Sequence, residues 1–414
     1  MTAMKRIFAF LFFIVAASCI DPYVPNLKNY KSLLVVEGVI TNENNSYKIK
    51  LCRTTNKENS DPEKITDATV DITDGDGRKT DLQNCGNGYY KTDSTSFTGI
   101  IGQKYSLGIY TSEGTEYKSD ECTMLPVAAI DKLYYEKGED MSGVRGEAVT
   151  GLKISLNSAD ATGFNQYFRW TFEETWKFLL PNPKRYNCLM VLNPDTYLFE
   201  EVPVVNDICW KKSQSQTILT SSILSGTTNY INGEQVQFID PVKSDRLTQE
   251  YSILVKQYSI SEKEYDFWNN LKKVSEAGGD IFDSQPYQVI SNVHNVSDVG
   301  EMVLGYFGVS SVSQKRIFIN SDELYPLDLP NFKTDCAEIP KSPEDWPVPP
   351  PPIGQPPTFY EIYYNIMNTG EYTFIRPIFN TNKTLQKLVY AKKICSVCEV
   401  SGFPTKPDFW IDQK

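Results

Sequence analysis

Histidine is scarce in this sequence: His294 is the single histidine among 414 residues. Histidine is the commonest general acid–base and the commonest metal ligand in proteins, so one copy leaves little room for either role. The surrounding stretch, residues 291–296, is typical of a strand edge or a loop. We therefore expect His294 to be structural, and we expect the variant His294→Ala to abolish no hydrolytic activity.

Common catalytic signatures are absent as well. The sequence contains no HExxH, GxxxxGK[ST], GxGxxG or GxSxG motif, which would indicate zinc, nucleotide phosphate, dinucleotide or serine-nucleophile chemistry. Glycoside cleavage by a pair of carboxylates is an alternative that the sequence does not exclude, because 52 acidic residues form many pairs and the sequence gives no distances. The formal net charge of -11 argues against non-specific nucleic-acid binding, which needs an excess of Lys and Arg. We expect no enzyme activity, no cofactor, no metal site and no nucleic-acid partner.

Long apolar runs are confined to the first twenty residues. Lys5 and Arg6 precede the apolar run Ile7–Ala17, which is shorter than the roughly 20 residues that cross a bilayer. This pattern predicts a signal peptide over residues 1–18. Its removal would change the formal net charge from -11 to -13.

The small residues before Cys19 resemble a bacterial lipobox, in which the cysteine becomes the lipid-modified N-terminus. More than one acyl chain is needed for stable anchoring, and a triacylated cysteine meets that requirement. We expect Cys19 to anchor the protein in the outer membrane, on the cell surface rather than the periplasmic face. The alternative is an ordinary secretory signal followed by an incidental cysteine.

Eight further cysteines favour disulfides in an oxidising compartment, although eight thiols allow 105 pairings. Cys188 and Cys209 flank a 20-residue excursion of little periodicity, so we predict that they form a bridge that adds roughly 3 kcal/mol. The motif Cys395–Cys398 lacks the second CxxC of a structural zinc site, and we expect at least one of its cysteines to bridge to Cys336. A redox or metal role, or thiols that are free or mutually bridged, are the alternatives.

The 25 Tyr and 21 Phe favour a mostly β protein, because aromatic residues suit a pleated, half-buried surface. After a tether over residues 19–31, short strands and recurrent turns predict an immunoglobulin- or transthyretin-like β-sandwich over residues 32–126. Within it, Asp74, Asp76 and Asp81 alternate with glycines. We interpret them as a hairpin turn rather than a calcium loop, since the glutamate at the twelfth position is missing.

A larger β-rich domain is predicted over residues 127–335. Its clearest strand, within residues 166–178, places Phe168, Trp170 and Phe172 on one face. One main helix is expected over residues 261–277. Ser261 and Glu264 would form its capping box, Gly278 and Gly279 would end it, and its apolar stripe would pack on a sheet rather than dock a partner: Tyr265, Trp268, Leu271 and Val274.

Residues 336–414 are expected to form an irregular C-terminal segment. Eight prolines fall between Pro343 and Pro357, a density that favours extended polyproline II structure. The neighbouring aromatics Trp346, Phe359 and Tyr360 are candidates for a partner-binding surface. The alternative is a stiff segment that crosses the surface without a partner.

Several segments together resemble the Bacteroidota lipoprotein family known as domain of unknown function 4249. They are the lipobox followed by residues 20–22, and residues 34–38, 68–72, 86–90, 102–107, 170–176, 303–307, 395–398 and 406–410. This resemblance spans nearly the whole mature chain and contains no catalytic motif. Members are typically encoded beside TonB-dependent receptors, so the resemblance implies a lipoprotein that works with such an outer-membrane barrel.

The leading expectation is therefore a non-enzymatic accessory or substrate-binding subunit of a TonB-dependent transporter. A stable contact with the barrel should bury about 1,200 Å² or more, with aromatic residues at its centre. A structural or adhesive surface lipoprotein is the first alternative, and an exported glycan hydrolase is the second.

Overall fold

The computed structural model of this chain confirms a mostly β protein with few helices. The parts of the chain that the structure describes are residues 31–56, 60–95, 97–141, 146–159, 167–190, 197–203, 207–223, 230–276, 289–345 and 357–411. The predicted signal peptide, Cys19 and most of the tether lie outside these residues.

An N-terminal β-sandwich is present, as the sequence predicts. One sheet has the order β21 (Leu304–Val309), β1 (Leu34–Ile40), β2 (Lys48–Arg53), β7 (Tyr89–Lys91) and β6 (Gln83–Asn84), with β3 (Glu63–Lys64) also paired to β2. The other has the order β20 (Val293–Asn295), β9 (Glu116–Ser119), β8 (Lys104–Tyr110), β4 (Thr69–Asp74) and β5 (Lys79–Asp81), with β10 (Cys122–Thr123) paired to β8. Apolar side chains from both sheets form a single core.

Two strands of this sandwich come from far down the chain. β21 runs parallel to β1, and β20 pairs with β9, whereas the sequence analysis assigned both segments to the second domain. Gly305 makes the first contact possible: it has a φ of +82°, and a Cβ at this position would collide with the carbonyl oxygen of Val36. The domain boundary expected near residue 126 therefore omits part of the sandwich.

The central domain consists of two further sheets that share one core. The first has the order β11 (Ala129–Asp140), β12 (Val149–Ala159) and β18 (Tyr230–Ile239). The second has the order β16 (Ile208–Gln214), β13 (Tyr167–Leu179), β19 (Glu250–Ser259) and β22 (Val312–Asn320), with β17 (Leu219–Ser222) also paired to β13.

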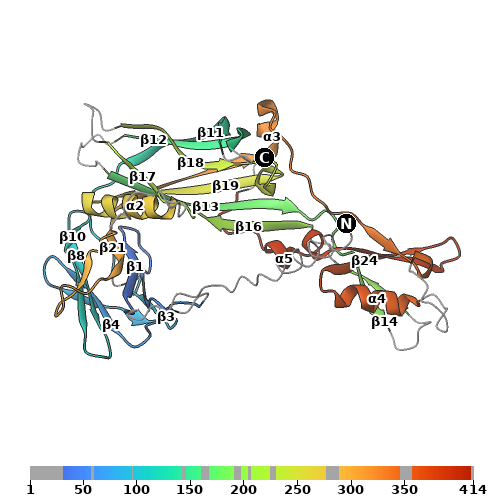
Figure 1. The fold of residues 1–414 in the computed structure, drawn as a ribbon. Coiled ribbons are helices and arrows are strands. Elements are labelled where there is room, and N and C mark those ends of the chain that lie inside the picture. Colours follow the sequence, from blue (N-terminus) through green and yellow to red (C-terminus); the bar gives the residue numbers. More distant parts are fainter. Residues whose placement is uncertain are drawn as a thin grey trace, which may run out of the picture.

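Helix α2 (Glu262–Glu276) confirms the predicted helix and lies between the sandwich and the central sheets (Figure 1). Ser261 Oγ accepts the backbone N–H of Glu264, as expected of a cap. The Glu264 side chain instead turns inward, is buried, and accepts a hydrogen bond from Trp268 Nε1. The packed face is shifted from the predicted stripe, because Phe267 is buried and Val274 is exposed. The glycines expected to end the helix lie outside the described residues.

The C-terminal segment is ordered rather than irregular, which corrects the expectation. It contains a sheet of β23 (Ile339–Lys341), β25 (Leu385–Lys392) and β24 (Tyr372–Phe379), covered by helix α4 (Phe359–Asn368). A hairpin of β14 (Tyr186–Met190) and β15 (Tyr197–Glu201) packs on the same core. These elements are called the C-terminal unit below. The short elements of this segment are η4 (Pro343–Asp345), η5 (Lys393–Cys395) and α5 (Cys398–Ser401). Two further short elements, α3 (Ser321–Leu324) and η3 (Tyr325–Leu327), follow β22 and pack on the core of the central domain.

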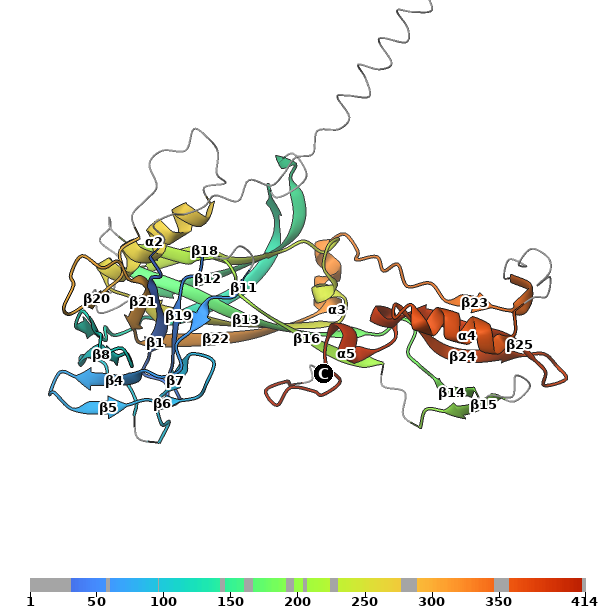
Figure 2. The ribbon, with the colours of Figure 1, turned by 60° about the horizontal axis from the view of Figure 1, so that its bottom comes forward.

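The sandwich and the C-terminal unit lie at opposite ends of the molecule, with the central sheets between them (Figures 1 and 2). Among the described helices, none is long and apolar enough to cross a membrane.

Candidate functional site

Glu174 is a buried carboxylate on β13, where the strand pattern calls for an apolar side chain. The even-numbered positions of this strand point into the core, and their apolar members are Phe168, Trp170, Phe172, Trp176 and Phe178. Glu174 shares this parity, and its side chain is 1% exposed. An unpaired carboxylate at such a depth is strongly unfavourable, so its partners decide whether the fold tolerates it.

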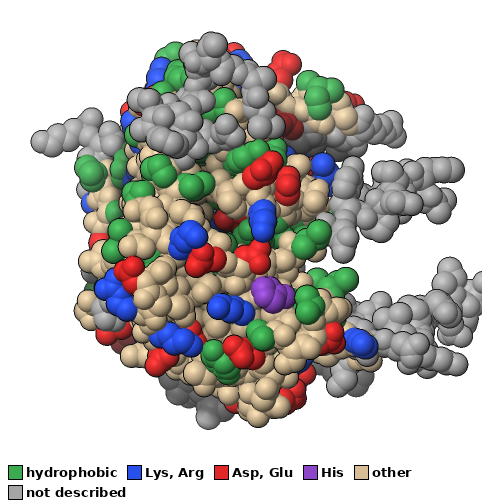
Figure 3. Space-filling model, turned by 90° about the vertical axis from the view of Figure 1, so that its left-hand side faces the viewer, with side chains coloured by type: hydrophobic (Ala, Val, Ile, Leu, Met, Phe, Trp, Pro, Cys, Tyr) green, Lys and Arg blue, Asp and Glu red, His purple; other side chains and the backbone are tan. Residues whose placement is uncertain are grey.

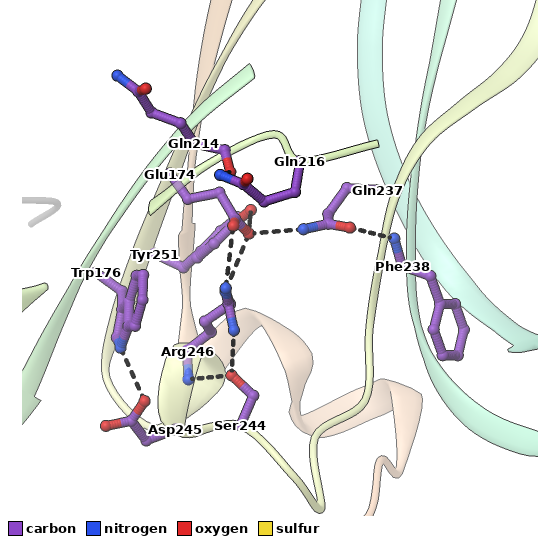
Figure 4. A network of polar contacts seen from close by, with 10 residues as sticks. All are labelled: Glu174, Trp176, Gln214, Gln216, Gln237, Phe238, Ser244, Asp245, Arg246 and Tyr251. Atoms are coloured by element: carbon purple, nitrogen blue, oxygen red, sulfur yellow. Dashed lines mark hydrogen bonds and ion pairs between the residues drawn. The ribbon is translucent and has the colours of Figure 1, made fainter. Parts of the chain in front are cut away.

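Three side chains donate four hydrogen bonds to this carboxylate (Figure 4). Arg246 donates from Nε to Oε1 and from Nη2 to Oε2, both at 3.1 Å. Tyr251 donates its hydroxyl to Oε1 at 2.7 Å, and Gln237 Nε2 donates to the same oxygen at 3.0 Å. The bidentate contact with arginine is the strongest geometry available to a carboxylate.

These partners come from different parts of the fold. Tyr251 lies opposite Trp176 on the neighbouring strand β19, whereas Gln237 lies on β18 of the facing sheet. Arg246 belongs to the short 3₁₀ turn η2 (Asp245–Leu247), which precedes β19. Glu174 thus joins both central sheets to one connecting turn.

Two further sets of contacts, made by Ser244 and Asp245, hold the turn η2 in place. Ser244 Oγ caps it by accepting the backbone N–H of Arg246 at 3.3 Å, and it also accepts Arg246 Nη1 at 2.9 Å. Asp245 accepts Trp176 Nε1 at 2.9 Å and Lys211 Nζ at 2.7 Å. The Arg246 guanidinium carbon lies 4.6 Å from the centre of the Trp176 ring, a cation–π distance.

The electrostatics of this cluster indicate a positioning role for Glu174. Burial raises the pKa of Tyr251 well above its ordinary value, and the adjacent Glu174 charge adds to this shift. Tyr251 therefore remains a protonated donor at neutral pH. The Glu174 carboxylate is buried and both of its oxygens accept hydrogen bonds, so a substrate would not reach it. Its role is to hold η2 in place.

Three cavities surround the turn. One of about 420 Å³ lies beside Phe178 and Cys395, and one of about 680 Å³ lies along Leu247 and Tyr325. The third is a shallow hollow of about 610 Å³ that is wide open to solvent, and it is lined by residues that include Trp176, Lys211, Lys212, Arg246 and Phe403. These volumes are in the range of small-molecule sites. Within the described ranges, no cluster of three or more His, Cys, Asp or Glu is arranged to hold a metal ion.

Comparison with protein families matches residues 20–316 to a family described as a domain of unknown function, DUF4249. The chain belongs to the DUF4249 family. This confirms the resemblance, but the match ends within β22, so the motifs at residues 395–398 and 406–410 lie beyond the matched DUF4249 residues. Most of the C-terminal unit, apart from the β14–β15 hairpin, is also outside them.

A search among curated proteins gave no significant match. Among solved structures, one titled "Biofilm associated protein - BSP domain" has 9% identity and a TM-score of 0.12 to this DUF4249 chain. The similarity covers 71% of this chain and 62% of that one, so the chain spans less than two thirds of its length. A TM-score this low gives no information about fold or function.

The disulfides of this DUF4249 protein match the predictions in part. Cys336 bridges to Cys395, as expected. The predicted Cys188–Cys209 bridge is wrong, because Cys209 on β16 pairs with Cys398 on α5, across a sequence separation of 189 residues. Cys188 instead lies in the β14–β15 hairpin and packs into the core of the C-terminal unit, where burial raises its thiol pKa to about 11. The excursion forms this hairpin, so it needs no bridge to hold it.

The predicted partner-binding aromatics are placed differently. Trp346 and most of the proline-rich run lie outside the described residues. Phe359 begins helix α4, is half-buried against the core of the C-terminal unit, and makes an edge contact with Tyr197 at 6.0 Å; its role as a contact residue stays a prediction. Tyr360 is half-buried on the side of the helix, and its ring centre lies 4.4 Å from that of Tyr364.

His294 lies on β20, an edge strand of the sandwich, as the sequence suggests. It is visible on the surface at that end of the molecule, where acidic, basic and apolar side chains are mixed (Figure 3). The Asp74 segment is the predicted turn: Asp74 Oδ1 accepts the backbone N–H groups of Asp76 and Arg78 at 3.0 and 2.9 Å.

The Glu174 cluster was not predicted from the sequence. The signal was present in β13, because Glu174 has the parity of Phe168, Trp170 and Phe172 and interrupts their apolar face. Its partner Arg246 is 72 residues away and lies in a turn without periodicity, so no local pattern could identify it.

Proposed function

We propose that this DUF4249 protein is a non-enzymatic outer-membrane lipoprotein, anchored through Cys19, that serves a TonB-dependent transporter as an accessory or substrate-binding subunit. The observation that carries the proposal is a set of exposed apolar side chains on the C-terminal unit. The two disulfides of the protein support export to an oxidising compartment.

Leu189 and Leu198 are exposed apolar side chains of the β14–β15 hairpin. They face each other across the β14–β15 hairpin and are 55% and 50% exposed. Their neighbours Cys188 and Phe199 have the opposite parity and pack into the core, so the two leucines point outward. Single exposed leucines are common, whereas a paired set is typical of an interaction surface.

Aromatic side chains extend the apolar character of the unit. Phe379 is 48% exposed and makes an edge contact with Phe199 at 5.8 Å, and Tyr364 on α4 is exposed beside Tyr360. Aromatic residues are enriched at the centres of protein interfaces. We assign the barrel contact to the C-terminal unit, with Leu189, Leu198 and Phe379 as contact residues.

Affinity purification from native membranes tests the proposal. A C-terminal tag and gentle detergent extraction should recover the lipoprotein together with a TonB-dependent barrel. Recovery of the lipoprotein alone, even after cross-linking in intact cells, would contradict a transporter role and favour a structural or adhesive lipoprotein. Deletion of residues 343–357 tests the proline-rich run separately, since equal recovery of the barrel would exclude it as the docking site.

A further inference from the structure

The cavity between Trp176 and Phe403 has a lining of one charge sign. Among the described residues that line it, Lys211, Lys212 and Arg246 are basic and none is acidic. The whole chain carries a formal net charge of -11, so a purely basic lining departs from its general character. Such a lining indicates an anionic ligand.

The three cations are not equivalent. Arg246 is paired with Glu174, and Lys211 is paired with Asp245 at 2.7 Å and lies 4.5 Å from the centre of the Phe178 ring. Lys212 is exposed, lies 5.1 Å from the centre of the Phe403 ring, and has no carboxylate within ion-pair distance in the described part of the chain. The cavity therefore offers one uncompensated positive charge, which suits a singly charged oxyanion.

The far wall of the cavity is fixed to β16 by the C-terminal chain. The Cys209–Cys398 disulfide holds α5, and Trp210 and Phe403 exchange two backbone hydrogen bonds of 2.9 Å. Gly402 permits this approach, because a Cβ there would collide with the carbonyl oxygen of Trp210. The Phe403 ring is thereby held beside Lys212 before any ligand arrives, which lowers the ordering cost of binding.

The remaining lining is polar and aromatic in a way that suits a sugar ring. Ser213 and Ser401 contribute hydroxyls, and Trp176 and Phe403 contribute ring surfaces. Ser401 Oγ is shielded from solvent and has no hydrogen-bond partner within the described ranges. A buried hydroxyl without a partner is costly, so a rotation of the Ser401 side chain that turns Oγ toward a ligand hydroxyl in the cavity would be favourable.

We propose that this cavity binds a carboxylate-bearing saccharide, with the carboxylate on Lys212 and the sugar ring beside Phe403 and Ser401. A cavity of about 610 Å³ accommodates one or two sugar rings. The assignment rests on the substrate-binding part of the proposed function and specifies the ligand class.

Calorimetry on the full mature chain in detergent tests it, with trigalacturonate, the matching neutral trisaccharide and a sulfate-ester analogue of that trisaccharide as probes. Trigalacturonate should bind at least about tenfold more tightly than the neutral sugar, which corresponds to one charge-assisted contact. Lys212→Gln should remove about this factor, Lys212→Arg should retain most of it, and Lys48→Gln, at an exposed lysine of the sandwich, should have no effect.

No binding of trigalacturonate, equal binding of the neutral sugar, or an unchanged affinity in Lys212→Gln would overturn the proposal. Tighter binding of the sulfate ester would overturn the choice of carboxylate. These outcomes are independent of the barrel, because the titration uses the isolated chain. Uronate binding without barrel recovery would refute the transporter partnership and leave the ligand assignment standing.

Discussion

Arg246 donates two hydrogen bonds of 3.1 Å to the two oxygens of Glu174, and so attaches the turn η2 to the core strand β13. The Glu174 side chain is 1% exposed and that of Arg246 is 25% exposed, so the pair spans from the interior to the rim of a cavity. The pair has a positioning role rather than a reactive one, because it fixes one wall of the cavity that we assign to ligand binding.

Removal of the arginine should destabilise the fold. Arg246→Met leaves the buried Glu174 carboxylate without its main partner, a change that costs about 3 kcal/mol or more of unfolding free energy. The control is Arg376→Met, since the Arg376–Glu338 pair is 36% and 39% exposed and such surface pairs contribute about 1 kcal/mol at most. Urea unfolding measures both. If Arg246→Met lowers the unfolding free energy no more than the control does, the Arg246–Glu174 pair does not stabilise the fold.

Stability at high pH should depend on Tyr251. Burial and the Glu174 charge raise its folded-state pKa well above the value of about 10 expected in the unfolded chain. The stabilisation of the fold by protonated Tyr251 is therefore complete below pH 10. It declines above pH 10 by about 1.4 kcal/mol per pH unit until the folded-state pKa is reached. Tyr251→Phe should make the unfolding free energy fall less steeply above pH 10. Identical slopes for both proteins would disprove this coupling.

The disulfide pairing can be read directly by peptide mapping without reduction. We expect the pairs Cys209–Cys398 and Cys336–Cys395, with Cys188 alkylated as a free thiol. Detection of a Cys188–Cys209 peptide would refute the pairing.

The long-range bridge should also contribute to stability. Because Cys209 and Cys398 are 189 residues apart, replacing both by alanine should lower the unfolding free energy by roughly 5 kcal/mol. Cys85→Ala, at an exposed free cysteine, is the matched control and should have little effect.

The proposed lipid anchor depends on one side chain, the Cys19 thiol. After the apolar run Ile7–Ala17, the Cys19 thiol is the side chain placed to accept lipid. Cys19→Ser should leave the precursor uncleaved by lipoprotein signal peptidase and unlabelled by radioactive fatty acid. Acyl labelling at the wild-type level in this variant would reject the assignment.

Elements with a local pattern were predictable from the sequence. The strand predicted within residues 166–178 is β13 (Tyr167–Leu179), and α2 spans Glu262–Glu276 against a prediction of residues 261–277. Alternation of period 2 and apolar spacing of 3.6 are encoded within a few residues, so each segment reveals its own structure. The turn at Asp74 was predictable for the same reason.

Pairings across the chain were not predictable in this way. β21 joins β1 from about 270 residues away, and Cys398 reaches Cys209 over 189 residues, without any local signal for either choice of partner. The Glu174 cluster was predictable only in part. Strand parity places the carboxylate in the core, but the cation that pairs with it is decided by tertiary packing. The basic cavity depends on the same kind of long-range contact, since Phe403 lies beside Lys212 where the C-terminal chain is joined to β16 by a disulfide and by backbone hydrogen bonds.

The proposed partnership with a TonB-dependent barrel is tested most directly by quantifying barrel recovery with surface variants. Leu198→Glu places a charge in the exposed leucine pair, where Leu198 is 50% exposed, and Ile290→Glu places the same charge at a 66% exposed site near β20. We predict that the barrel co-purifies with wild type and with Ile290→Glu, and that Leu198→Glu lowers the barrel-to-lipoprotein ratio at least about tenfold, as expected for a charge buried in an interface core. Absence of the barrel from the wild-type preparation would contradict the account, and equal recovery with both variants would exclude the hairpin as the contact.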